Sequence, residues 1–392
     1  MITEAPTVTA LLESIVKALE IPPSYYEKAI ARHRSLGEWL CRPESRVAAF
    51  APSVVPQGSF RYGTVNRPLL ATDKYDLDNV TTLALAKTVM SQKELKHLYG
   101  AEIKEYAIAH KMTDPVEERN RCWRLFYADE FSFHLDTLPC VPEDRQIISA
   151  IVDRGVPQNL AKLAVAITDK RHPQYEQITP LLFSSNPRGF AGWFEQCARI
   201  WALPRLLQLV KSNLYASVED VPTYEWKTPL QHGIQILKRH RDVMFRTNPA
   251  VAPISMIITN LAAHAYSGEP DLYTALTNIV EKMPQYVNAQ RPRVPNPANP
   301  AEDYADKWAA NRNLEQHFWL WHTQIAADLK KLPAFLSGDA LFADIRRTFG
   351  VELSEEELRP FEGQRIRRAP AIVRTAALSI PPSAPRPWGD DD

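Results

Sequence analysis

The stretch between Gln57 and Asp78 reads Gln-Gly-Ser-Phe-Arg-Tyr-Gly-Thr-Val-Asn-Arg-Pro-Leu-Leu-Ala-Thr-Asp-Lys-Tyr-Asp-Leu-Asp. Its first part contains Gly58-Ser59, a pair that predicts a turn because glycine tolerates backbone angles that other residues avoid. Its last part contains Asp76 and Asp78, two carboxylates one residue apart. We interpret the rest of the chain as what holds, completes or regulates this stretch.

A period-two pattern predicts that the stretch ends in a β-strand. Tyr75 and Leu77, together with Val80, are expected to face one side of this strand. Because successive side chains of a strand point to opposite faces, Asp76 and Asp78 would then project side by side from the other face.

A third carboxylate occurs in another predicted strand. Residues 122–128 and 131–138 are both predicted to be extended, with residues 129–130 as the hairpin turn between them. In the second of these segments, Ser132, His134 and Asp136 share the face opposite the apolar residues. If this segment lies beside the strand of Asp76 and Asp78, three carboxylates converge, although the sequence does not fix the register.

Three clustered carboxylates suit a pair of metal ions. Mg²⁺ prefers oxygen ligands, and two ions about 3.5–4 Å apart can activate a hydroxyl and neutralise a leaving pyrophosphate. We predict that Asp76 and Asp78 bridge two Mg²⁺ ions, with Mn²⁺ as a possible substitute, and that Asp136 binds the ion at the attacking hydroxyl. Gly58 would let the backbone approach a phosphate, and Ser59 would offer a hydroxyl and an amide to a triphosphate.

Each of these parts also has an ordinary structural explanation. A Gly-Ser pair is most often only a turn, and an Asp-x-Asp pair is most often a solvated strand face or loop. It is their combination at this spacing that favours a metal-dependent site for a nucleoside triphosphate. For His134 we expect a hydrogen bond to a metal ligand and not a role as a base, because two-metal transfer does not require a histidine.

The overall composition is typical of a globular protein in a reducing compartment. Lys plus Arg and Asp plus Glu each number 46 among 392 residues, which excludes a wholly basic protein that coats nucleic acid. The four cysteines show neither metal-ligand spacing nor a disulfide framework. The chain shows no secretory signal and no run of about 18 apolar residues, so we expect a cytoplasmic protein with no membrane partner.

Helical periodicity dominates the rest of the chain. Helices are predicted at residues 7–20 and 22–41, both expected to brace the site from behind, and at 91–111. Beyond about residue 142 the pattern is almost wholly helical, apart from a proline-rich loop at residues 291–300 that is too stiff for a helix. The strongest helical candidates there are residues 190–212, 224–246, 252–267, 272–288 and 313–332.

These elements predict a bilobal α+β fold. A small mixed β-sheet core with its N-terminal helices is expected at residues 1–150, and a helical lobe that closes the cleft at residues 151–360. Residues 361–392 contain several prolines and arginines without periodicity and are predicted to form a flexible tail. The aromatic run Phe318-Trp-Leu-Trp321 lies in an apolar helix, so we expect it to fill a core and not to stack on bases.

The motifs together resemble a known signature. Gln57-Gly-Ser with Gly63-Thr64, then Asp76-Leu-Asp78, then Leu135-Asp136, resemble the nucleotidyltransferase signature of the polymerase-beta superfamily. Within it, the chain resembles the bacterial CD-NTases, the cGAS/DncV-like enzymes of CBASS antiphage systems. Segments at residues 237–242, 254–263 and 296–300, with Glu302 and Trp308, are similar to segments of these cyclases.

The resemblance implies an activity and further site residues. It implies an enzyme that condenses nucleoside triphosphates into a cyclic di- or trinucleotide second messenger for antiphage defence and releases pyrophosphate. It also implies that Lys238 and Ser255 contact the donor triphosphate, together with Gln57, Gly58 and Ser59. Lys238 has a structural alternative, since it could lie on a solvated helix face with its neighbouring arginines.

The resemblance leaves other functions open. One alternative is a linear nucleotidyltransferase that acts on RNA or a small acceptor, and another is a non-catalytic module that senses a nucleotide. The chain has no His/Cys cluster like the zinc insert of the animal DNA sensor, so zinc-dependent DNA sensing is not expected. In some CBASS operons regulatory or conjugation proteins act on the C-terminus, and the predicted tail would permit such partners.

Overall fold

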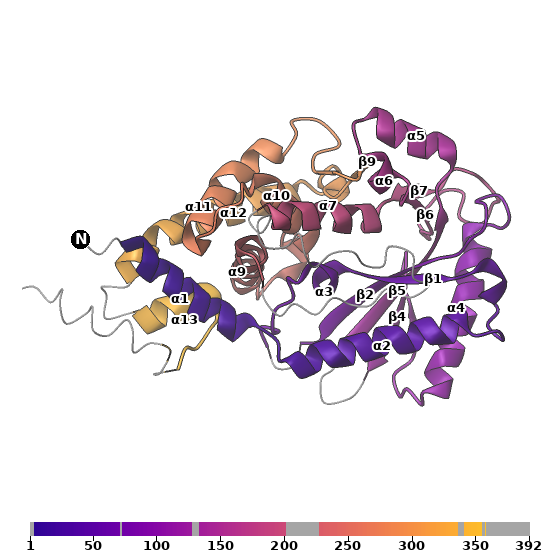
Figure 1. Cartoon of the computed structure of the whole chain (residues 1–392), viewed down its shortest axis with the longest axis horizontal. Coiled ribbons are helices and arrows are strands. Elements are labelled where there is room, and N and C mark those ends of the chain that lie inside the picture. Colours follow the sequence, from indigo (N-terminus) through magenta and orange to yellow (C-terminus); the bar gives the residue numbers. More distant parts are fainter. Residues whose placement is uncertain are drawn as a thin grey trace, which may run out of the picture.

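The computed structural model describes residues 4–70, 73–127, 133–200, 227–335, 341–354 and 357. It combines a β-sheet region with a larger helical region, and the two lie side by side (Figure 1). The predicted α+β class is therefore confirmed. The hairpin turn predicted at residues 129–130, the end of the helix predicted at 190–212 and the tail at 361–392 lie outside the described residues.

One mixed sheet carries the aspartates. Its strands run in the order β1 (Ser53–Gln57), β2 (Tyr75–Thr82), β5 (Phe133–Pro142), β4 (Trp123–Tyr127) and β3 (Glu117–Glu118). The central pair β2 and β5 is parallel, whereas β1 with β2 and β4 with β5 are antiparallel. The predicted strands and their mixed arrangement are thus confirmed.

The sheet continues further along the chain than the sequence indicates. Strand β5 also pairs with β6 (Val165–Ile167), which in turn pairs with β7 (Phe183–Ser185). The proline-rich loop contributes a second small sheet, formed by β8 (Pro295–Asn296) and β9 (Asn299–Asp303). The expectation of an almost wholly helical chain beyond residue 142 is therefore wrong, because strands of two to five residues are too short to show a period.

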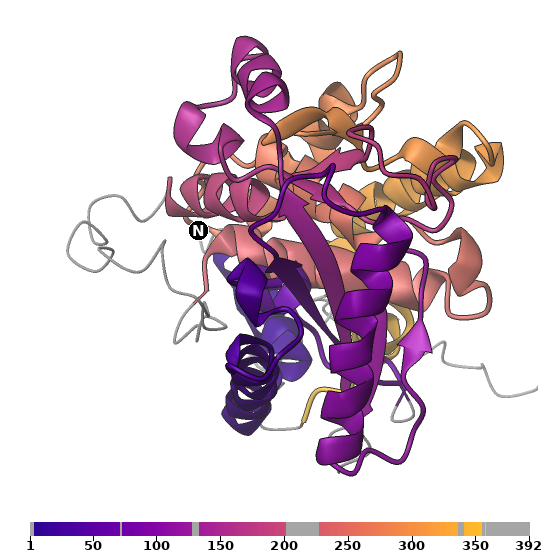
Figure 2. The same ribbon diagram turned by 90° about the vertical axis from the view of Figure 1, so that its right-hand side faces the viewer.

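Two helices cover one face of the main sheet. α2 (Pro23–Cys41) and α4 (Gln92–Ala109) bury their apolar sides against Leu77 and Leu135, and Figure 2 shows α4 in front of the strands. A capping box fixes the start of α4. The Ser91 side chain accepts a hydrogen bond from the Glu94 backbone, and the Glu94 side chain accepts one from the Ser91 backbone. Both helices match their predicted ranges closely.

Val80 does not share the face of Tyr75 and Leu77. It packs with Val55, Cys140 and their neighbours in a separate small cluster on the side of Asp76 and Asp78. The sequence-based prediction for Val80 is wrong, because strict alternation places the even-numbered residues of β2 together. The aspartate face of the strand is thus polar at its start and apolar at its end.

The largest apolar core lies among the remaining helices. It joins α7 (Pro187–Arg199), α9 (Pro229–Met244), α10 (Ser255–Ala265), α11 (Leu272–Lys282), α12 (Arg312–Phe335) and α13 (Leu341–Phe349). Phe318 and Trp321 are fully buried in it, which confirms the core prediction for these two residues, whereas Trp319 is partly buried and Leu320 is 55% exposed. No described helix is both long and apolar enough to cross a bilayer.

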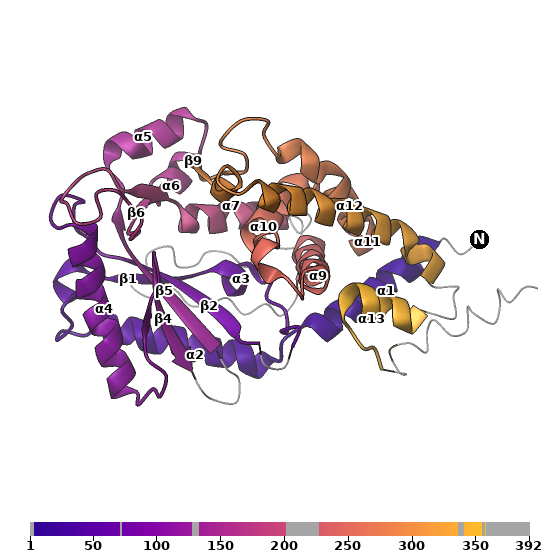
Figure 3. The ribbon, with the colours of Figure 1, turned by 180° about the vertical axis from the view of Figure 1, so that it is seen from behind.

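The first helix belongs to this helical core. α1 (Glu4–Leu19) buries Leu11, Leu12 and Ile15 among the helices of the C-terminal half, and Figure 3 shows it next to α13. Of the two N-terminal helices, only α2 packs against the sheet. The expectation that both of them stand behind the site is therefore wrong for α1. Its apolar stripe fitted either partner, and the sequence pattern does not distinguish them.

Two helical glycines differ in the space around them, which predicts opposite effects of alanine. A methyl group at Gly100 of α4 would lie 2.2 Å from the Trp123 ring, whereas at Gly233 of α9 the nearest atom is 3.6 Å away. We expect Gly100→Ala to lower the free energy of unfolding by about 1–3 kcal/mol through overpacking. Gly233→Ala should be neutral or raise it by up to about 1 kcal/mol, because alanine favours helix.

Urea denaturation of both variants and the parent protein measures this difference. Equal effects of the two substitutions would contradict the tight contact between Gly100 and Trp123.

Candidate active site

Parallel pairing brings the three predicted carboxylates to one place. Strands β2 and β5 are in register with Asp78 opposite Asp136 and Asp76 opposite His134. All three aspartates therefore lie on the same face of neighbouring strands. The geometric condition that the sequence left open is met, and the metal-binding roles of these residues stay a prediction.

Burial and mutual repulsion raise the pKa of the two β2 carboxylates, Asp76 and Asp78. Burial, together with the charges of Asp76 and Asp136, raises the pKa of Asp78 from 3.8 to about 8. Burial also raises the pKa of Asp76, and Asp136 adds to the effect while Arg124 opposes it. Because the side chain of Asp76 is 64% exposed, water screens much of its interaction with the other groups.

Arg124 neutralises part of this negative charge. It lies on β4 directly opposite Asp136, and its Nε and Nη2 atoms donate to the two carboxylate oxygens of Asp136 over 2.6 and 2.8 Å. Its Nη2 is also 3.9 Å from Asp76 Oδ1. This two-pronged ion pair engages both carboxylate oxygens of Asp136, and the sequence pattern does not predict it.

The three aspartates are the type of ligand that a divalent metal ion prefers, but their side chains are not arranged around one common point. Three carboxylates on one face of neighbouring strands form a donor set that Mg²⁺ favours. Yet in the described part of the chain no three His, Cys, Asp or Glu side chains are close enough to hold one ion together. The pairing of Asp136 with Arg124 is consistent with this, because the guanidinium engages both oxygens of the third carboxylate.

The glycine of the opening motif makes room for Asp78. Gln57 ends β1 opposite Asp78, and Gly58 begins the short helix α3 (Gly58–Tyr62) with a φ of 70°. A Cβ atom at Gly58 would lie 2.2 Å from Asp78 Oδ2. Gln57, Gly58 and Ser59 thus start a segment whose backbone passes directly over the carboxylate, and only glycine satisfies both the angle and the space.

Lys238 reaches the same region from the helical side. It lies on α9 and is 8% exposed, and its Nζ donates to the Thr64 carbonyl over 2.8 Å. Burial lowers the pKa of Lys238 to about 8, with Arg241 adding to the effect and Asp78 opposing it. The alternative of a solvated helix face is therefore wrong for Lys238.

Ser255 has a less direct relation to the carboxylates. It begins α10, and its hydroxyl accepts a hydrogen bond of 3.2 Å from Arg241, which lies almost one turn after Lys238 on α9. Arg241 also donates to the Pro253 carbonyl over 2.6 Å. The structure thus connects Ser255 to Lys238 through Arg241 and leaves its contact with a triphosphate as a prediction.

A row of side chains on α9 holds the segment that follows α3. Gln231 donates to the Tyr62 carbonyl over 2.9 Å and Gln235 to the Val65 carbonyl over 2.8 Å, while Arg239 donates to the Arg67 carbonyl. We call residues 62–67 the strap. These bonds, and the one from Lys238 to Thr64, hold the strap against the helical region. They thereby also position the phosphate motif, which is Gln57-Gly58-Ser59.

His134 approaches Asp76 without a good hydrogen bond. Its Nδ1 is 3.6 Å from Asp76 Oδ1, which exceeds the usual range for an N–H···O bond. Burial lowers the pKa of His134, and Arg124 adds to this effect. The predicted hydrogen bond to a metal ligand is thus not formed at this distance.

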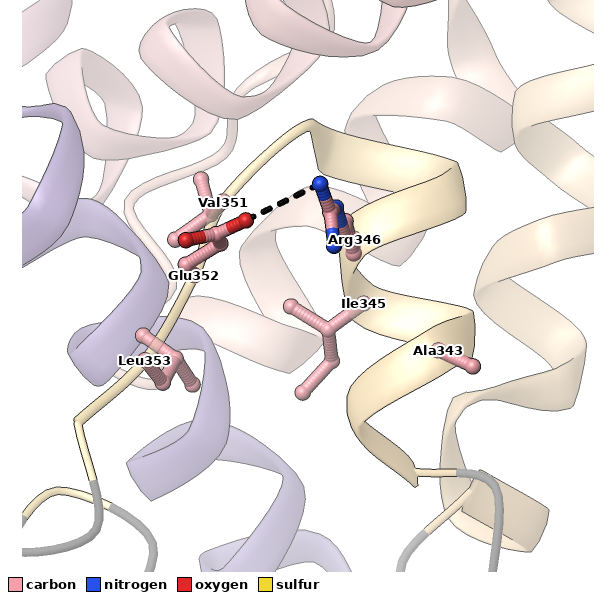
Figure 4. Close-up of a pocket in the computed structure, with 6 residues that line it drawn as sticks. All are labelled: Ala343, Ile345, Arg346, Val351, Glu352 and Leu353. Carbon is pink, nitrogen blue, oxygen red and sulfur yellow. Dashed lines mark ion pairs between the residues drawn. The ribbon is translucent and has the colours of Figure 1, made fainter.

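The described cavities lie away from the carboxylates. One of about 410 Å³ is lined by Lys17, Arg67 and Arg239 with residues 350–352. A second, lined by residues of α13 and the segment after it, contains the 3.1 Å ion pair between Arg346 and Glu352 (Figure 4). Neither of these two cavities includes an aspartate of the sheet, so we define the site by its side chains.

Comparison with known proteins supports the same assignment of the sheet region. Residues 52–139 match the family model described as cyclic GMP-AMP synthase DncV-like, nucleotidyltransferase domain. A c-di-GMP synthase from Roseivirga ehrenbergii is 26% identical over 78% of this chain and 74% of its own length. Cyclic dinucleotide synthase CdnG from Bradyrhizobium diazoefficiens is 25% identical over 96% of this chain and 89% of its own.

Solved structures show the same fold. The structure of CdnG from Bradyrhizobium diazoefficiens in complex with GTP superposes with a TM-score of 0.65, at 22% identity, over 91% of this chain and 99% of that chain. DncV cyclic AMP-GMP synthase from Vibrio cholerae, in complex with a linear intermediate, gives a TM-score of 0.53 at 14% identity over 91% and 88%. Both similarities extend over the sheet and the helical region.

The raised pKa of Asp78 predicts how stability depends on pH in the absence of metal. Because the folded protein holds the Asp78 proton up to about pH 8 and the unfolded chain only to about pH 4, stability is lost as pH rises through this window. Relative to Asp78→Asn, the parent protein should lose about 1–3 kcal/mol of unfolding free energy between about pH 5 and pH 8. Lys238 does not mask this, since its lowered pKa changes stability only above about pH 8.

Urea denaturation in EDTA across this pH range measures the effect. Parallel pH profiles for the parent protein and the Asp78→Asn variant would contradict the clustering of charge at Asp78.

Proposed function

We propose that this chain, which is a CD-NTase of the DncV-like kind, condenses nucleoside triphosphates into a cyclic dinucleotide and releases pyrophosphate. The observation that carries the proposal is the in-register pairing of Asp78 with Asp136, beside Asp76, inside the segment that matches the nucleotidyltransferase family. The named relatives that are cyclic dinucleotide synthases favour a product of two nucleotides over one of three.

The carboxylates are proposed to hold two Mg²⁺ ions, or Mn²⁺ in their place. Bound ions would supply Lewis-acid stabilisation of the charge on the triphosphate and on the attacking oxygen. Asp76 and Asp78 would bind the ions. Asp136 would bind the ion at the attacking ribose hydroxyl and help to take up the proton of that hydroxyl.

The chain's other site residues would position the triphosphate. Gly58 lets the backbone approach closely, and Ser59 offers its hydroxyl and amide to phosphate oxygens. Lys238 would exchange the Thr64 carbonyl for a phosphate oxygen, which is a better partner for an ammonium group because the hydrogen bond becomes charge-assisted at both ends. Gln57 from the sheet region and Ser255 from the helical region complete the proposed set.

The reaction is then two successive transfers. In each, a ribose hydroxyl oxygen forms a bond to an α-phosphorus, the bond from that phosphorus to the pyrophosphate group breaks, and the hydroxyl proton leaves. The second transfer closes the ring within the linear intermediate. Phosphoryl transfer of this kind depends mainly on positioning and charge stabilisation, which is what the described side chains offer.

The biological setting is proposed from the family. A cytoplasmic second-messenger synthase in CBASS antiphage defence would answer to an infection signal, and conjugation or regulatory proteins would act on residues 361–392. These residues lie outside the described part of the chain, so that proposal rests on their composition and on the resemblance.

The carboxylates give the most direct test of the activity. Purified protein incubated with all four NTPs and Mg²⁺ or Mn²⁺ should yield a phosphatase-resistant cyclic product by mass spectrometry. Asp76→Asn combined with Asp78→Asn should reduce its formation by about 10³-fold or more, since electrostatic stabilisation of the transition state is lost. A linear product alone would indicate a linear transferase, and NTP binding without turnover would indicate a sensing module.

Lys238 gives a second test, directed at triphosphate binding. Loss of a charge-assisted hydrogen bond is worth about 1.5–3 kcal/mol, so Lys238→Met should weaken NTP affinity by about 10- to 100-fold. Lys330→Met, which removes an exposed lysine on α12, is the matched control and should leave the affinity unchanged. Isothermal titration with GTP measures both, and equal affinities would rule out the proposed role of Lys238.

A further inference from the structure

The pairing of Arg124 with Asp136 has a property that the proposed reaction does not use. Both side chains are about one-fifth exposed, so the pair lies at the edge of the site and not deep in a core. Its two donor atoms face the two oxygens of one carboxylate, the most directional form of ion pair that arginine makes. Asp136 is thus held in one orientation by a fixed positive charge.

This charge lies where a metal ion would have to approach. A guanidinium that faces both oxygens of Asp136 repels a divalent cation approaching the same oxygens, and it stands 3.9 Å from Asp76 as well. In the absence of metal, the same charge lessens the repulsion among three carboxylates on adjacent strands. Arg124 therefore favours the metal-free arrangement over the metal-bound one.

We propose that Arg124 is a positioning residue that competes with the divalent cation for Asp136, so that the third carboxylate is released only when the cation displaces the guanidinium. The inference deepens the proposed function, because it assumes that the aspartates bind metal. It predicts that the loss of Arg124 strengthens cation binding, whereas a merely structural residue would weaken cation binding or leave it unchanged.

The test measures Mn²⁺ binding directly, by electron paramagnetic resonance of free Mn²⁺ in a titration of the full chain without nucleotide. Arg124→Gln should tighten Mn²⁺ binding by about fivefold or more, because it removes a charge that opposes the ion. In an Asp136→Asn background the same substitution should give a clearly smaller gain, because the contested ligand is gone and only the longer interaction of Arg124 with Asp76 remains.

Lys74 is the matched control for charge alone. It is a partly exposed cation over the Phe126 ring and close enough to lower the pKa of His134, but it does not hold Asp136. Lys74→Gln should therefore change Mn²⁺ affinity by less than about twofold. An equal gain from Lys74→Gln and Arg124→Gln would overturn the specific competition at Asp136.

Thermal unfolding shows whether the variants remain folded. Arg124→Gln should melt at a lower temperature than the parent protein in EDTA and recover more on addition of Mn²⁺. If Arg124→Gln does not fold, Arg124→Lys keeps a charge without the two-pronged geometry and should show a smaller gain of the same sign.

The outcomes separate this inference from the function on which it rests. If neither the parent protein nor Arg124→Gln binds Mn²⁺, the proposed metal site itself is overturned. If the parent protein binds Mn²⁺ and Arg124→Gln binds it no more tightly, only the competition is overturned and the proposed reaction stands.

Discussion

The parallel pairing of β2 with β5 is the constraint on which the site depends. Paired positions of two parallel strands carry their side chains on the same face of the sheet, so Asp78 lies beside Asp136 and Asp76 beside His134. Such a row of like charges costs free energy in the folded state, and the backbone ladder of the sheet holds it in place. Two residues reduce this cost. Gly58 leaves space for the Asp78 carboxylate, and Arg124 supplies a positive charge to Asp136.

Helix α9 connects the helical region to the site. The helix is anchored in the largest core by Leu230, Ile234 and Leu237, and its other side presents Gln231, Gln235 and Lys238 to the strap. A capping box formed by Thr228 and Gln231 fixes where α9 begins, and Gln231 then also bonds the Tyr62 carbonyl. The start of the helix and the position of the phosphate motif are therefore set by overlapping contacts.

Much of the fold and the identity of the carboxylates could be predicted from the sequence, because strands with strict alternation and long amphipathic helices leave clear periods. The partner of Asp136 could not. A two-residue turn at residues 129–130 would have paired Leu135 with Arg124, whereas the observed register pairs Asp136 with Arg124, and a shift of one residue exchanges the faces of a strand. The location of α1 and the short strands β6 and β7 could not be predicted either, since neither an apolar stripe nor a segment of three residues specifies a neighbour.

The way α9 holds the strap has a consequence for how the protein can vary. The bonds from Gln231, Gln235, Lys238 and Arg239 all end on backbone carbonyls, and every residue type offers such a carbonyl. As far as these bonds are concerned, the strap's side chains are free to change while the helix positions are not. Other contacts do restrict the strap, since Tyr62 packs against Phe190 and Phe194 of α7 and the Asn66 side chain donates to the Gln235 carbonyl. The freedom to vary therefore applies to strap positions that are held through their backbone alone, and not to Tyr62 or Asn66.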